Sequence, residues 1–494
     1  MKGTSRIRRL ASETAVYGIS SVFARLINFL LFPFYSHVFV PGEYGIVNTV
    51  FATFIFLNVL YQYGMESAYL KYASDSDHNG DGRARSDIFS TSVWSLVATS
   101  LLFSALLLVL RGPTSALIDL DVEWQHLLYY VAAILILDTA VVVPFAELRL
   151  TNRPVRFAVV KLINVGINVG LNLVLILGYG MGIEAVFIAN LVASASSIVL
   201  MLPSYLKLLR PAFDRSLWRE MLYFGLPFIP GGLGYAFSDR VNLFFLQHLD
   251  GEQVTRMLPA GVAPAAATSN YIVGLFSGAT KIAVMMALVV QMFRYAWQPF
   301  FLQHSRDEDA APLFGRVFGL FVGACILIAL GVTFFAKELV ALPLPGGRHL
   351  IAESYWPGLV VVPILLLGYV FQGMYYNFSA GAYITKNTKF FATCAMAGAV
   401  VAIVLNAFLV PRYGMYGAAW ATAAAYFTMA ISLHFFVQRV YPVPYPWLRT
   451  LALFAVGGGS YAAWIRYTFL QSWYAEAGLL VGVAIVAFLL MWRR

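Results

Sequence analysis

Charged residues, cysteines and enzyme motifs are all scarce in this chain of 494 residues. Asp, Glu, Lys and Arg make up only 12% of it, whereas a soluble globular protein has about 25%. So few charges cannot cover a water-exposed surface, which argues against soluble enzymes, nucleic-acid-binding proteins and disordered scaffolds. The two cysteines, Cys325 and Cys394, lie in apolar stretches and exclude a disulfide framework or a cysteine-based metal centre.

The chain also lacks motifs and loops that would support catalysis. The seven histidines are scattered, and there is no HExxH zinc motif or GxxxxGKS/T phosphate loop. No loop is large enough to form a catalytic domain, which argues against a glycan polymerase or ligase. The longest external loop, residues 248–269, is rich in Ala, Pro and Gly. We therefore expect a protein that is not an enzyme, with no metal site and no cofactor apart from H+ or Na+ as a coupling ion.

Hydrophobic residues, in contrast, make up 60% of the chain, and the mean hydropathy is +0.75. A membrane-spanning helix needs roughly 20 mostly apolar residues, and this rule predicts fourteen spans, hence an all-α polytopic membrane protein. Their approximate ranges are 14–40, 46–70, 88–110, 125–147, 157–177, 182–205, 221–247, 270–301, 313–335, 356–380, 390–410, 415–437, 447–469 and 475–492.

The basic residues are unevenly distributed over the predicted loops. With residues 1–13 as a cytoplasmic N-terminal segment, the cytoplasmic segments hold 22 Lys and Arg and the external ones hold six. Cytoplasmic loops of membrane proteins collect Lys and Arg, so most of the net charge of +9 serves to set orientation. We expect a multi-pass protein of the cytoplasmic (inner) membrane with both termini in the cytoplasm.

The chain contains an internal repeat. Residues 147–195 align without a gap with residues 381–429, and both copies contain Leu-Asn followed by Tyr-Gly-Met at the same spacing. The repeat relates spans 5–6 to spans 11–12, so the repeating unit has six helices and both halves have the same topology. We expect two pseudo-symmetric six-helix lobes, residues 14–205 and 221–437, and an appended helix pair at 447–492. Such lobes enclose a central cavity, as in a transporter.

Ionisable side chains within spans mark functional sites by default. Apart from the cations close to span ends, which we count with the adjacent loops, five cations lie within the predicted spans, whereas Asp138 is the one deep, isolated acid. A cavity with net positive charge attracts anions, and phosphate suits Arg and Lys. The cations are Arg25, Lys161, Arg240, Lys281 and Arg294.

Two polar helix faces extend this set of candidate substrate-binding residues. Asn28 shares a face of the first span with Arg25, and the fifth span carries a polar stripe at i, i+3, i+7 and i+11. The stripe forms either a wet cavity wall or a contact between helices. Its members are Lys161, Asn164, Asn168 and Asn172.

The seventh span is interrupted, and interrupted helices in transporters mark binding sites and hinges. The candidate hinge residues are Pro227, Pro230, Gly231 and Gly232. Asp239 and Arg240 follow, either as part of the site or as charges that neutralise nearby partners. The candidate coupling residues are Asp138, Asp239 and Glu66.

Three stretches carry a resemblance to a known family: Pro41-Gly-Glu-Tyr-Gly with the helix that runs to Tyr63-Gly-Met, Ser238-Asp-Arg before residues 241–246, and residues 271–300, which end in Ala-Trp-Gln-Pro-Phe. Through them the chain resembles the polysaccharide-biosynthesis, or O-antigen flippase, branch of the multidrug/oligosaccharidyl-lipid/polysaccharide exporter superfamily. The resemblance implies a MATE-like fold and alternating access between two lobes.

It also implies a cargo: an undecaprenyl-pyrophosphate-linked oligosaccharide, such as an O-antigen unit of lipopolysaccharide, moved from the cytoplasmic to the periplasmic leaflet. Arg25, Arg240, Lys281 and Arg294 would line the lumen by similarity. The implied partners are this lipid-linked substrate, the bilayer and the glycan polymerase or ligase machinery, with no nucleic acid. The alternatives are a peptidoglycan-precursor (lipid II) flippase and a cation-coupled multidrug exporter, the latter disfavoured by the shortage of deep acids.

Overall fold

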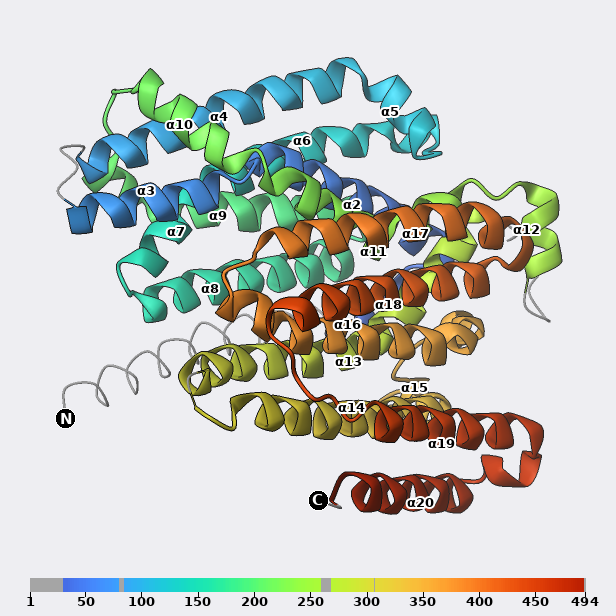
Figure 1. Ribbon diagram of the computed structural model, residues 1–494. Helices are drawn as coiled ribbons and strands as arrows, with labels where there is room; N and C mark the ends of the chain where they lie inside the picture. The colour runs from blue at the N-terminus through green and yellow to red at the C-terminus, as the bar shows by residue number, and fades with distance from the viewer. Residues whose placement is uncertain (1–29, 80–83, 259–267, 306, 493–494) are drawn as a thin grey trace. The chain divides into compact units, whose positions relative to one another are not determined.

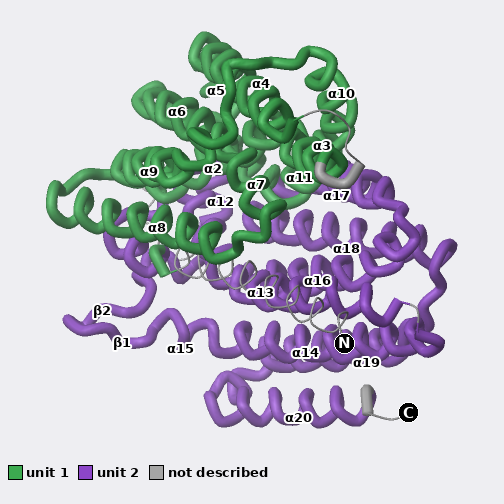
Figure 2. Tube along the Cα trace, turned by 90° about the vertical axis from the view of Figure 1, so that its left-hand side faces the viewer, with its two compact units in different colours: residues 1–31, 42–248 green, residues 32–41, 249–494 purple. Residues whose placement is uncertain are grey.

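The computed structural model describes residues 30–79, 84–258, 268–305 and 307–492, and almost all of them are helical (Figure 1). Contacts divide the chain into two compact units (Figure 2). Unit 1 comprises residues up to Leu31 and Gly42–His248, and unit 2 comprises Phe32–Pro41 and Leu249–Arg494. The segment 221–248, which the sequence analysis assigned to the second lobe, therefore groups with unit 1 by its contacts; the lobe boundaries themselves stay a prediction.

Eleven helices in the described part of the chain are long and apolar enough to cross a membrane. They correspond to eleven of the fourteen predicted spans. Of the other three, the first is described only from residue 30 and is helical over 30–38, the seventh is divided by a break, and the thirteenth is a helix of 20 residues, Trp447–Arg466. The all-α membrane fold is confirmed, and the number fourteen stays a prediction.

Unit 1 is a bundle of helices, the structure that satisfies most backbone polar groups within one segment, as the apolar interior of a membrane requires. Helix α4 (Arg85–Val109) packs small hydroxyl side chains against its neighbours: Ser95 Oγ accepts a hydrogen bond from Trp218 Nε1 at 2.7 Å. The remaining elements of this part of the chain are α2 (Pro41–Gln62), α3 (Met65–Asn79), α5 (Arg111–Leu117), η1 (Val122–His126), α6 (Leu127–Ala140), α7 (Val142–Leu150), α8 (Pro154–Leu173), η2 (Val174–Gly178), α9 (Glu184–Leu208), α10 (Arg215–Gly225) and α11 (Phe228–Gln247).

Two helix breaks meet inside unit 1. The first separates α2 from α3 at Gly64, which has φ +75°, and the second separates α10 from α11 after Gly225. A Cβ atom on Gly64 would lie 2.2 Å from the carbonyl oxygen of Gly225. Only glycine combines this backbone conformation with so close an approach. The contact between the two breaks therefore depends on glycine at position 64.

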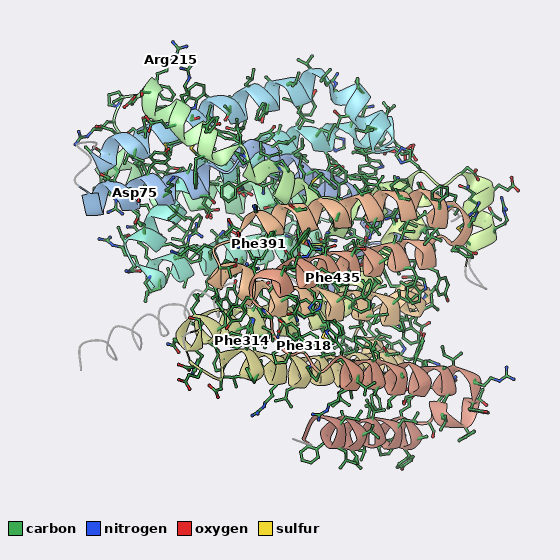
Figure 3. All side chains as sticks on the ribbon, viewed as in Figure 1. Asp75, Arg215, Phe314, Phe318, Phe391 and Phe435 are labelled. Carbon is green, nitrogen blue, oxygen red and sulfur yellow. The ribbon has the colours of Figure 1, made fainter. Side chains whose placement is uncertain are left out.

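Unit 2 is built around α13 (Ser269–His304), α14 (Ala310–Phe334), α16 (Val362–Ile384) and α18 (Met415–Val440). Aromatic side chains fill the space between them, among them Phe314 and Phe318 on consecutive turns of α14 (Figure 3). A two-stranded antiparallel hairpin pairs Pro343 with His349 and Leu344 with Arg348. The remaining elements are α12 (Gly251–Met257), α15 (Ala336–Val340), β1 (Pro343–Leu344), β2 (Arg348–His349), η4 (Glu353–Val361), α17 (Lys389–Tyr413), α19 (Trp447–Arg466), η5 (Thr468–Gln471) and α20 (Trp473–Trp492).

The repeated segments of the sequence have the same local structure. The pairs α8–α9 and α17–α18 are both helical hairpins. Asn172 and Asn406, equivalent in the alignment, each donate a hydrogen bond to the carbonyl four residues earlier, both at 2.8 Å. The equivalent Gly180 and Gly414 both have positive φ, +65° and +53°. These shared features support a true repeat over a chance match of apolar sequence.

The segment Phe32–Pro41 is docked on unit 2, although the chain on both sides of it belongs to unit 1. This segment packs on the GxxxG motif of α13, which is formed by Gly274 and Gly278. Small residues of this kind let two backbones approach closely in membranes. A Cβ atom on Gly274 would lie 1.7 Å from the carbonyl oxygen of Pro41, and one on Gly278 would lie 3.0 Å from the ring of Phe32. Tyr355 of η4 also donates a hydrogen bond to the carbonyl of Phe39 at 2.9 Å.

Replacing Gly274 by alanine is expected to lower the free energy of unfolding by about 1–3 kcal/mol, because the new methyl group must displace backbone rather than a flexible side chain. The matched control is Gly458→Ala on α19, where a Cβ would meet no atom within 4 Å; we expect it to be neutral or slightly stabilising. Unfolding in mixed micelles, followed by circular dichroism, measures both. Equal stability of the two variants would contradict this docking.

Candidate functional site

The described candidate residues lie on five helices of the two units, whereas Arg25 and Asn28 lie outside the described residues. Those of unit 1 are Glu66 on α3, Asp138 on α6, Lys161, Asn164 and Asn168 on α8, and Asp239 and Arg240 on α11; those of unit 2 are Lys281 and Arg294 on α13.

Lys161 lies beside an aromatic ring and near an acid. Its Nζ atom is 4.3 Å from the centre of the Phe145 ring on α7, within the range of a cation–π interaction. Asp138 accepts a hydrogen bond from Ser194 of α9 and interacts electrostatically with Lys161. The two charged groups form no direct ion pair within 4 Å, so α6, α7, α8 and α9 together hold a cation and an acid that interact without direct contact.

The asparagines of the polar stripe make contacts inside unit 1. Asn164 Nδ2 donates to the carbonyl of Ala193 at 2.7 Å and to Ser197 Oγ at 3.0 Å, which ties α8 to α9. Asn172 donates to both the carbonyl and the side chain of Asn168. At these positions the structure shows a contact between helices, and a role of Asn164 and Asn168 in substrate binding stays a prediction.

The charged pair of α11 is an ion pair between neighbours. Arg240 Nε lies 2.8 Å from Asp239 Oδ2, and both side chains keep some exposure, 29% and 20%. The break predicted just before it falls at Pro227, between α10 and α11, whereas the other hinge candidates, Pro230, Gly231 and Gly232, lie within the first turns of α11. A Cβ atom on Gly232 would lie 2.8 Å from Val59 of α2, so this part of the helix is closely packed.

In unit 2, Arg294 lies over the ring of Tyr376 on α16, with 4.7 Å between the guanidinium carbon and the ring centre. No acid of the described chain forms an ion pair with Arg294. Lys281 lies on the same helix and is half-buried. A guanidinium that rests on a tyrosine and keeps its charge unneutralised can bind an anion, while the ring offers a face for a sugar.

Two acids in unit 1 are held by arginines. Glu66 pairs with Arg149. Glu147 Oε2 accepts hydrogen bonds from Tyr69 at 2.5 Å and from Arg85 at 3.0 Å. The sequence analysis named Asp138 as the one deep, isolated acid, and this stays a prediction; Glu147, which the sequence analysis did not single out, is only 7% exposed. It was missed because it stands at the last residue of a predicted span.

A second missed acid lies in the appended helix pair. Glu476, on α20, is only 2% exposed. The sequence alone shows Glu476 as a charged residue at the start of the last predicted span. Within the described ranges, no group of three or more His, Cys, Asp or Glu residues is placed to hold a metal ion.

A model of the polysaccharide biosynthesis protein family matches residues 10–305 of the chain. No functionally curated protein matches it. Solved structures do match, and they share the fold. One is lipid II flippase MurJ in an inward closed conformation, with a TM-score of 0.73, 15% identity, and coverage of 96% of this chain and 98% of that one.

Multidrug transporters share the fold over slightly less of the chain. An inward-facing multidrug resistance MATE family transporter of the MOP superfamily has a TM-score of 0.61 and 15% identity, over 84% of this chain and 94% of that one. A variant of the Vibrio cholerae MATE transporter VcmN has a TM-score of 0.60 and 14% identity, over 89% and 98%. The MATE-like fold expected from the sequence is therefore confirmed.

Proposed function

Because the chain belongs to the polysaccharide biosynthesis protein family, we propose that it is a flippase for a lipid-linked glycan. The cargo is an undecaprenyl-pyrophosphate-linked oligosaccharide, an O-antigen or another surface polysaccharide unit. The protein moves it from the cytoplasmic to the periplasmic leaflet by alternating access. The two termini lie in the cytoplasm in this proposal, in accord with the distribution of Lys and Arg.

The single observation that carries the proposal is the environment of the Arg294 guanidinium. Its guanidinium rests on Tyr376 within a helix that is long and apolar enough to cross the membrane, and no described acid pairs with it. A charge at such a place costs free energy unless it meets a cavity or a ligand. A pyrophosphate supplies the opposite charge, and the sugars next to it supply the apolar faces that pack on tyrosine.

The acids of unit 1 favour the same cargo over a cationic drug. Asp239, Glu66 and Glu147 each lie beside an arginine. An exporter of cations needs acids whose charge its substrate can neutralise. Here arginines already neutralise these three acids. Asp138 is the coupling candidate that has no direct ion pair with any described residue, and we propose it as the residue to test for H+ or Na+ coupling.

Depletion of the protein tests the proposed function. We expect an undecaprenyl-pyrophosphate-linked oligosaccharide to accumulate in the cytoplasmic leaflet, measured by mass spectrometry of extracted lipids together with a leaflet-specific labelling of the glycan. Accumulation of lipid II in its place would identify a peptidoglycan-precursor flippase. Altered drug sensitivity with no accumulated lipid-linked glycan would identify a multidrug exporter.

A further inference from the structure

Two acidic side chains are almost completely buried in the described part of the chain, and they differ in their surroundings. Glu147 is neutralised by Arg85 and receives a hydrogen bond from Tyr69. Glu476 forms no ion pair within the described chain. The proposed flippase function does not use Glu476, so its burial needs another explanation.

Glu476 lies one turn into α20 and is held against α19. Trp464 Nε1 donates a hydrogen bond to its Oε1 atom at 2.9 Å. Its Oε2 atom is buried and has no hydrogen-bond partner in the described residues. The ring of Trp464 packs in turn on Phe334 of α14, with 5.4 Å between the ring centres. The carboxyl group therefore sits where α14, α19 and α20 come together.

The charged groups around Glu476 do not favour an ionised carboxylate. The ionisable group that interacts with it electrostatically is Glu338 of α15, a like charge. From α19 it meets the indole of Trp464. In η5, the neutral side chain of Gln471 donates a hydrogen bond from its amide nitrogen to the carbonyl of Trp464.

The energetic terms decide between the two protonation states. The N-terminal end of α20 favours a negative charge by about 0.3–1 kcal/mol, and by up to about 2 kcal/mol in buried geometries. Desolvation of a carboxylate that lacks a counter-charge costs several kcal/mol. A protonated oxygen without a partner costs only about 1–3 kcal/mol. Compared with a glutamate in water, these terms therefore shift the balance from the carboxylate toward the neutral acid.

We propose that Glu476 and Trp464 form a proton-binding site of the α19–α20 pair. Glu476 carries one proton on its carboxyl group while α20 is packed against α19. At high pH the O–H bond breaks, the proton passes to a base in solution, and the resulting carboxylate weakens the packing of α20. This site goes beyond the proposed transport function, and the purified protein without substrate is sufficient to test it.

Infrared spectroscopy of the full chain in detergent micelles detects the proton directly. In the difference spectrum of wild type minus Glu476→Gln at neutral pH, we expect the carbonyl band of a protonated carboxylic acid. The control is Glu338→Gln, which removes the neighbouring exposed acid and should keep the band. A carboxylate band in place of the acid band would overturn the proposal. So would loss of the acid band when choline is replaced by sodium at constant pH, since the occupant would then be a cation.

Stability against pH gives an independent readout. The unfolded chain releases the glutamate proton above about pH 4.3, whereas the folded state retains it, so the folding equilibrium constant should fall as pH rises. One proton gives a change of up to about tenfold per pH unit. By this linkage we expect the wild type to lose stability as pH rises above about 4.3, until the folded carboxyl group also releases its proton. Glu476→Gln, a neutral isostere, should lose less stability over the same range. Identical pH profiles for the two proteins would overturn the proposal.

Discussion

Replacing Arg294 by alanine is expected to reduce transport of the lipid-linked glycan by about 30-fold or more, with normal amounts of folded protein in the membrane. The removal of one partner of a desolvated charge interaction costs about 2–5 kcal/mol, and about 1.4 kcal/mol corresponds to a factor of ten. The measurement is transfer of a fluorescent lipid-linked glycan across proteoliposome membranes, normalised to the amount of reconstituted protein.

Two further variants separate charge from shape at this position. Arg294→Lys keeps the charge but loses the planar group that rests on Tyr376, so it should retain part of the transport. Tyr376→Phe keeps the ring, and its transport rate should be close to that of the wild type. Tyr376→Leu should lower the transport rate about 2- to 30-fold, the factor that corresponds to the free energy of a cation–π contact. If Arg294→Ala transports the glycan as fast as the wild type, Arg294 is structural.

Replacing Glu147 by alanine is expected to lower the free energy of unfolding by about 3–5 kcal/mol, the cost of removing one partner from a buried ion pair. The change leaves the guanidinium of Arg85 without its counter-charge and the buried phenol of Tyr69 without its acceptor. Unfolding in mixed micelles measures the loss. Proteolysis of the membrane-embedded protein gives a second measure.

The matched control for Glu147 is a pair on the surface. Glu252 and Arg256 form an i,i+4 ion pair whose side chains are 82% and 68% exposed, and such pairs contribute about 0–1 kcal/mol. Glu252→Ala should therefore leave stability nearly unchanged. The double variant Glu147→Ala with Arg85→Ala should lose less free energy of unfolding than the two single variants lose together. Additive losses would show that the contact of Glu147 with Arg85 is not energetically coupled.

Sequence patterns predicted the helices and the repeat because both depend on local composition. Apolar runs of span length became helices, and the two Tyr-Gly-Met turns have glycines of positive φ in both copies. The charges inside spans were also visible, but their partners were not. Lys161 meets Phe145, and Arg294 meets Tyr376, each on a different helix. Helical periodicity assigns a residue to a face and does not say which helix packs on that face.

Two features could have been predicted and were missed. Gly274 and Gly278 form a GxxxG motif in an apolar stretch, a known signal for close helix packing. Glu476 is an acid in an apolar segment of span length. Glu147 was harder, because Arg85 and Tyr69 lie 62 and 78 residues away in the sequence. Only the fold brings these three side chains together.

The docking of Phe32–Pro41 on unit 2 has a consequence for synthesis of the protein. The carbonyl of Phe39 and the hydroxyl of Tyr355 that binds it are 316 residues apart. Ribosomes add about 5–20 residues per second, so this early segment leaves the ribosome about 15–60 s before Tyr355 does. The N-terminal helices must therefore be inserted and retained without this contact. Packing of the C-terminal end of the first helix is completed only after most of the chain has been translated.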